Sequence, residues 1–137
     1  MEVHTKYKFY LDLAIQISSA SYCERNKVGA LLVKDDNIIS FGYNGTIRGF
    51  DNKCEDHNNK TTPWVLHAES NAITKCAKSN YSSSGATLYT TISPCIECAK
   101  LIIQSEIKEV IYLHEYRDIS GINLLKKANI DVWQYIH

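Results

Sequence analysis

The second half of this 137-residue chain alternates strand-like with helix-like segments, which restricts its possible folds more than any other feature of the sequence. Short apolar runs predict strands over residues 86–91, 109–113 and 131–135. Segments of helical composition lie between them, over residues 93–104 and 120–128. Because crossover helices connect parallel strands, we expect a partly parallel sheet that is covered by helices.

The first half of the chain supplies the remaining predicted elements. Apolar residues at helical spacing predict a helix over residues 5–19. Two apolar runs, over 28–33 and 38–43, flank a polar turn and predict a β-hairpin. A long polar loop follows over residues 44–63, and at this length in a compact domain we expect it to be functional. Another helix is expected over residues 67–78.

Length and composition limit the architecture and the class of partner. A chain of 137 residues with 45% hydrophobic content suffices for one core, so we expect a single domain over residues 1–137. The predicted elements give an α/β fold, a three-layer α/β/α sandwich around a five-stranded mixed sheet. The 15 basic and 15 acidic residues balance, which favours a small ligand over nucleic acid.

Targeting signals and a disulfide framework are not expected. The sequence contains no apolar run long enough to span a membrane, and its N-terminus lacks the pattern of a signal peptide. We therefore expect a cytoplasmic protein without a membrane partner. Five cysteines are an odd number, and without a secretion signal metal ligation is favoured over disulfides.

Two short motifs bring together the residue types of a metal-dependent catalytic site. His67 supplies an imidazole, and Cys95 and Cys98 supply two thiolates, three of the four ligands that a tetrahedral Zn²⁺ prefers. A closed structural site would show four such ligands, so this set leaves one position for water. Both motifs fall at the start of a predicted helix, where the helix dipole favours thiolates. Glu69 lies two residues past the histidine and is a candidate to move protons.

These motifs resemble the His-x-Glu and Pro-Cys-x-x-Cys signature of zinc-dependent nucleobase deaminases. Zinc lowers the pKa of a bound water from about 15.7 toward about 7. Glu69 would then take the water proton and deliver it first to ring N3 of an aminopyrimidine and then to the departing amine. A purely structural zinc site is the alternative for the same residues.

The longer sequences around the motifs resemble the cytidine and deoxycytidylate deaminase superfamily. The similar stretches are residues 67–73, with the sequence HAESNAI, and residues 93–100, with the sequence SPCIECAK. Residues 42–49, with the sequence GYNGTIRG, look like the deoxycytidylate deaminase branch. The resemblance extends to residues 116–117 and so covers most of the chain. The short length and the loops that carry Asn and Lys suit a phage or bacterial member.

The resemblance implies an activity, cofactors and an assembly. Members of this branch hydrolyse dCMP to dUMP and ammonia, which supplies dUMP for dTMP synthesis. By likeness we expect a zinc enzyme in the cytoplasm, or in the host cytoplasm for a viral protein. We also expect a homohexamer that dCTP with Mg²⁺ activates and dTTP inhibits.

The resemblance also implies roles for individual residues in substrate binding. Asn44 is expected to hydrogen-bond the sugar 3′-hydroxyl, and Ala68 is expected to contact the substrate. Arg25, Tyr116 and Arg117 are expected to surround the phosphate, a role that suits guanidinium groups. The alternatives are a turn residue for Asn44, beside a glycine, and solvated surface positions for the arginines.

The resemblance to the deoxycytidylate deaminase branch also implies a regulatory loop. Asn44, Gly45 and Arg48 match the segment that resembles the effector-binding loop. Relatives often carry proline where this chain has Ile47. This difference lies in the expected effector-binding loop and so bears on the response to effectors.

A second, structural zinc is expected from some viral and bacterial members of the family. They resemble this chain in two cysteines, here Cys23 and Cys54, and in a histidine ten residues before the catalytic one, here His57. Such a metal would contribute folding energy to a loop with little else to pack. Glu55, Asp56, another histidine or water could serve as its fourth ligand. Two reduced cysteines in a mobile loop are the alternative.

Three other functions remain open at this stage. The pocket could accept dCTP in addition to dCMP or in place of it. An RNA-editing adenosine deaminase shares the zinc arrangement, although neutral charge and the GYNG segment argue against it. A non-catalytic zinc module for protein binding is the third function, and the presence of Glu69 argues against it.

Overall fold

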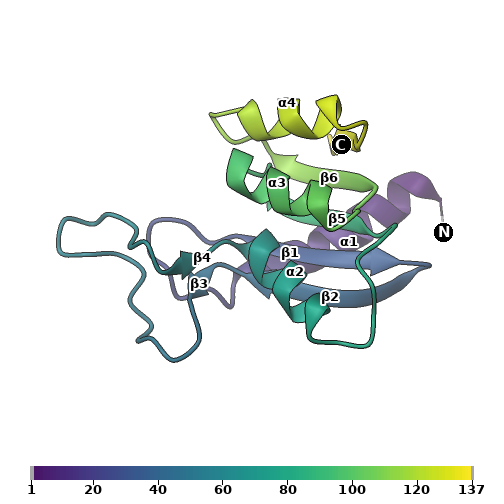
Figure 1. Ribbon diagram of the computed structural model, residues 1–137. Helices are drawn as coiled ribbons and strands as arrows, with labels where there is room; N and C mark the ends of the chain where they lie inside the picture. Colours follow the sequence, from purple (N-terminus) through teal and green to yellow (C-terminus); the bar gives the residue numbers. More distant parts are fainter. Residues whose placement is uncertain (1, 137) are drawn as a thin grey trace.

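The computed structural model describes residues 2–136, which form one five-stranded mixed sheet with four helices (Figure 1). The sheet order is β2-β1-β5-β6-β7, in which β1 is antiparallel to both of its neighbours and the other two pairs are parallel. The parallel half is the part that the alternating segments predicted. The strands are β1 Gly29–Lys34, β2 Asn37–Tyr43, β5 Thr87–Ile92, β6 Glu109–His114 and β7 Asp131–Gln134.

The helices cover both faces of the sheet. Helix α1 packs on one face, and the other three lie on the opposite face (Figure 1). Two apolar cores result, and the period-2 alternation of β1 divides its side chains between them, with Leu31 beneath α1 and Leu32 beneath α2. The predicted α/β/α sandwich is therefore confirmed. The helices are α1 Val3–Ser18, α2 Ala68–Ala77, α3 Ile96–Gln104 and α4 Ser120–Lys127. Within residues 2–136, none of the helices combines the length and apolar character that crossing a membrane requires.

The predicted hairpin closes through a tight two-residue turn. Asp35 and Asp36 have φ values of 51° and 62°, so both lie in the left-handed region. Two consecutive residues with positive φ are the mark of the turn whose twist matches antiparallel strands. Lys34 pairs with Asn37 across it, which fixes the register of β1 against β2.

The long loop after β2 contains structure that the sequence did not predict. Strands β3 (Gly45–Thr46) and β4 (Val65–Leu66) pair antiparallel at its two ends. Between them the chain folds back on itself through a bridge between Glu55 and Thr61. This segment projects from one end of the molecule (Figure 1). Its two short strands bring the end of β2 beside the start of α2.

Gly121 permits a close backbone contact between α4 and the segment that precedes α3. A Cβ atom at this position would lie 2.1 Å from the carbonyl oxygen of Pro94 and 2.7 Å from the carbonyl carbon of Cys95. We therefore expect Gly121→Ala to lower the free energy of unfolding by about 1–3 kcal/mol, because backbone atoms must shift to make room. Urea denaturation measures this, with Asn123→Ala as the control at an exposed position of the same helix. Equal stability of the two variants would contradict the packing argument.

Candidate active site

The His-x-Glu and Cys-x-x-Cys motifs meet where two helices begin. His67 is the N-cap residue of α2 and Cys95 is the N-cap residue of α3. Neither side chain caps its own helix by a hydrogen bond, so both are available for other contacts. Cys98 lies in the first turn of α3 and is buried. The prediction that both motifs open helices is confirmed.

The three side chains form a group that could hold a metal ion. The Nδ1 atom of His67 lies 3.3 Å from the Cys98 sulfur and 3.5 Å from the Cys95 sulfur. A nitrogen and a sulfur bound to one tetrahedral zinc, at about 2.0 and 2.3 Å, would lie about 3.5 Å apart. The spacing therefore fits one shared ion. The hydroxyl of Ser70 also lies 3.5 Å from the Cys98 sulfur and can donate a hydrogen bond to a thiolate there.

The electrostatics of the group favour a thiolate next to a cationic imidazole. Hydrogen bonds from the Cys98 thiol and the His67 imidazole lower the pKa of Cys95, an effect larger than the opposing effect of burial. The hydrogen bond to Cys95 raises the pKa of His67. A metal ion at this position would take over the role of the imidazole proton, because metal ligands must be deprotonated.

Glu69 lies buried in the first turn of α2, with 5% of its surface exposed. Burial raises the pKa of Glu69 from its ordinary value to about 7, because a carboxylate loses its hydration there. A carboxyl group of this kind can take up and release a proton near neutral pH. This is the property that a proton shuttle needs.

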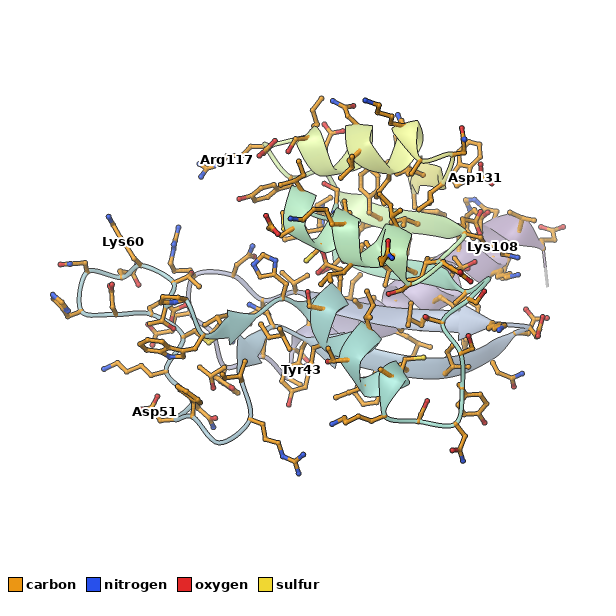
Figure 2. All side chains as sticks on the ribbon, in the orientation of Figure 1. Tyr43, Asp51, Lys60, Lys108, Arg117 and Asp131 are labelled. Atoms are coloured by element: carbon orange, nitrogen blue, oxygen red, sulfur yellow. A yellow bond between two sulfur atoms is a disulfide. The ribbon has the colours of Figure 1, made fainter. Side chains whose placement is uncertain are left out.

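A cavity of about 340 Å³ opens onto these groups. Two arginines from separate parts of the chain also line it, Arg25 before β1 and Arg117 after β6. Arg117 and the loop that carries Lys60 lie at the same end of the molecule (Figure 2). The lining therefore combines a metal-capable group, a proton carrier and two cations. Of the predicted site residues, those that line it are Arg25, Asn44, His67, Ala68, Glu69, Cys95, Tyr116 and Arg117.

The side chain of Asn44 joins the loop before β1 to the end of β2. Its Oδ1 atom accepts a hydrogen bond from the Val28 N–H at 2.8 Å, and its Nδ2 atom donates one to the Asn26 carbonyl at 2.8 Å. These bonds fix the amide at the cavity wall and leave one N–H of Nδ2 for another partner. Asn44 is thus a structural residue that also faces the cavity.

The expected second zinc site stays a prediction. In the structure Cys23 and Cys54 form a disulfide, a pairing that the sequence did not favour over metal ligation. His57 is exposed in the turn of the long loop, where residues 56–60 fold back. The residue that the fold brings to the two sulfurs is instead Glu55, whose carboxylate lies within 4.8 Å of them.

Two of the three expected effector residues, Gly45 and Arg48, lie apart from the cavity lining, whereas Asn44 is part of it. Gly45 belongs to β3, where a Cβ atom would lie 2.9 Å from the Tyr22 hydroxyl oxygen. Arg48 is exposed beyond β3. Their regulatory role therefore remains a prediction.

Several lining residues were not predicted from the sequence. Val28, Val65 and Ile92 give the cavity apolar walls of the kind that hold a flat ring. Asn26, Thr61 and Ser93 add polar groups. Five of the six lie within three residues of a strand end, and Thr61 lies four residues before β4. Val65, Ile92 and Ser93 lie close to the motifs in the sequence. The fold brings Asn26, Val28 and Thr61 to the same cavity from more distant parts of the chain.

The fold and the site together define a domain of the nucleobase deaminase class. The sequence model of the "Cytidine and deoxycytidylate deaminase zinc-binding region" matches residues 4–114. The chain belongs to the cytidine and deoxycytidylate deaminase family.

Individual relatives agree with this assignment. The crystal structure of the dCMP deaminase from cyanophage S-TIM5, in complex with dCMP and dUMP, is 43% identical with a TM-score of 0.94, and the match covers 98% of each chain. The deoxycytidylate deaminase of Enterobacteria phage T4 is 32% identical, over 90% of this chain and 86% of that protein. That of Saccharomyces cerevisiae is 34% identical over 93% of this chain. The chain spans 44% and 60% of the length of the first two curated relatives that it matches.

Proposed function

We propose that this protein is a zinc-dependent deaminase that hydrolyses dCMP to dUMP and ammonia. The observation that carries the proposal is a single cavity lined by Glu69, by two arginines and by His67 and Cys95, which form a metal-capable group with Cys98. The 43% identical cyanophage protein, crystallised with dCMP and dUMP, supports the choice of substrate.

Zinc fits the donor set, since one imidazole and two thiolates at this spacing suit a tetrahedral ion with one open position. His67, Cys95 and Cys98 would hold it. When bound, zinc lowers the pKa of water so that hydroxide is available near neutral pH.

Glu69 would carry the protons of the reaction. As the water oxygen bonds to C4 of the cytosine ring, the Glu69 carboxylate takes a water proton and delivers it to N3. The remaining hydroxyl proton then passes through Glu69 to the amino group, the C4–N bond breaks, and ammonia leaves. The pKa of about 7 suits a group that must both accept and donate a proton.

The two arginines of the cavity lining would bind the phosphate. Arg25 and Arg117 are the cations among the described lining residues, and Glu69 is the acid. Guanidinium groups bind phosphate oxygens through paired N–H donors. Tyr116, whose backbone N–H bonds to the Ser93 hydroxyl at 2.7 Å, would contact the phosphate beside Arg117. Asn44 would use its remaining N–H for the sugar 3′-hydroxyl, and Ala68 would contact the base.

The family likeness supports further proposals about regulation and assembly. We infer a homohexamer that supplies dUMP for dTMP synthesis, activated by dCTP with Mg²⁺ and inhibited by dTTP. The effectors would bind at the loop that contains Asn44, Gly45 and Arg48.

Ultraviolet absorbance assays with dCMP, dCTP, CMP and cytidine, each with and without dCTP or dTTP as effector, test the proposal. Fastest turnover of dCMP, changed by the triphosphates, is the expected result. Preference for dCTP would reassign the substrate. Failure of the zinc-loaded protein to consume any of the four would overturn the proposal and favour RNA substrates or a binding role.

A further inference from the structure

We propose that Glu55 is a positioning residue that holds Arg25 in place for the phosphate of the substrate. This inference rests on the proposed function, because it requires a substrate that carries a phosphate. Glu55 itself is absent from the cavity lining, so it would act through Arg25 alone.

The Glu55 side chain is buried and bonds to the backbone beside Arg25. It has 7% of its surface exposed, and with the buried Cys54 it lies between exposed stretches of the long loop, residues 51–53 and 56–61. Its Oε2 atom accepts hydrogen bonds from the backbone N–H groups of Glu24 and Arg25, each at 3.1 Å. Hydrogen bonds to an ionised carboxylate are about twice as strong as neutral ones. The carboxylate therefore fixes the backbone from which the Arg25 guanidinium extends.

The same piece of chain also contacts the Arg25 side chain. Glu55 forms a bridge with Thr61, and the Thr61 hydroxyl accepts a hydrogen bond from the Arg25 guanidinium at 3.4 Å. Cys54, the residue before Glu55, is bonded to Cys23, two residues before Arg25. The segment over residues 54–61 thus holds Arg25 through its backbone, its side chain and a nearby covalent link.

A positioning role and a simple charge effect predict opposite results. A negative charge near a bound phosphate repels it, so removing the charge alone should lower the KM for dCMP. Removing a group that positions Arg25 should raise that KM, because the guanidinium would lose its fixed orientation. The direction of the change therefore distinguishes the two.

The experiment compares Glu55→Ala and Glu55→Gln with the wild-type protein, using dCMP and the phosphate-free deoxycytidine. For Glu55→Ala we expect the KM for dCMP to rise about tenfold, the loss expected for hydrogen bonds to a charged group. We expect kcat for dCMP, and kcat/KM for deoxycytidine, to stay within about twofold. Glu55→Gln keeps an oxygen acceptor, so its KM should fall between those of Glu55→Ala and the wild type.

Glu24→Ala is the matched control, since it removes an exposed carboxylate next to Arg25 that makes no such bonds. Its KM should stay level or fall. Zinc content and melting temperature confirm that each variant is folded. An unchanged or lower KM for Glu55→Ala, or equal losses with both substrates, would overturn the inference. If the wild-type protein does not turn over dCMP, it is the proposed function that fails.

Discussion

Replacing Glu69 with glutamine is expected to reduce dCMP turnover by about 10³–10⁴-fold while the protein keeps its fold and its metal. Glutamine has nearly the same shape as glutamate but cannot accept and release the proton, and general acid–base catalysis contributes about 10²–10⁴-fold. In the proposed mechanism one carboxyl serves two proton transfers, so the loss should reach the upper end of that range. The measurements are kcat by ultraviolet absorbance and zinc per chain by metal analysis.

Glu97→Gln provides the control for Glu69→Gln. Glu97 occupies the first turn of the other motif-bearing helix, but it is exposed and pairs with Lys100 at 2.8 Å. Its replacement should change kcat by less than about twofold, since exposed ion pairs contribute little. Activity of Glu69→Gln within tenfold of the wild type would contradict the assigned mechanism.

Most of the fold could be predicted because its signals are local. Apolar periodicity located the helices and the five long strands to within a few residues, and the two aspartates marked the hairpin turn. The two-residue strands β3 and β4 are too short to show any periodicity. They form because the ends of the long loop meet in space.

The candidate site, like the fold, could be predicted where its signals are local in sequence and not where its contacts depend on the folded chain. The His67 and Cys95 motifs could be found because each lies within a few consecutive residues, and the sheet order then brings them together. The contacts of Cys23 and Cys54 depend on how a loop folds over 31 residues of separation. Spacing suggested His57 as their partner, whereas the bridge between Glu55 and Thr61 leaves that histidine in solvent. The burial of Glu55 and its bonds to the backbone of Glu24 and Arg25 were missed for the same reason.

Replacing Cys98 with alanine is expected to remove the metal and with it the activity. Zinc held by protein ligands contributes about 10–16 kcal/mol, so one ligand accounts for roughly 3–4 kcal/mol, or about 10²–10³-fold in affinity. Because Cys98 is buried between the two helix starts, no neighbouring side chain among the described residues replaces it in the metal-capable group. Zinc competition with a chelator and the melting temperature with and without chelator measure the effect.

Cys76→Ala separates loss of the metal from loss of a buried sulfur. Cys76 is buried to the same degree as Cys98, on α2, but its sulfur contacts the Tyr81 carbonyl and no metal-capable group. This variant should therefore lose some stability through the cavity that it creates, yet bind zinc as the wild type does. Chelator should lower the melting temperature of the wild type and of Cys76→Ala, and leave that of Cys98→Ala nearly unchanged. If Cys98→Ala instead binds zinc as tightly as Cys76→Ala, the ion is held elsewhere, and the site at the two helix starts is not the catalytic one.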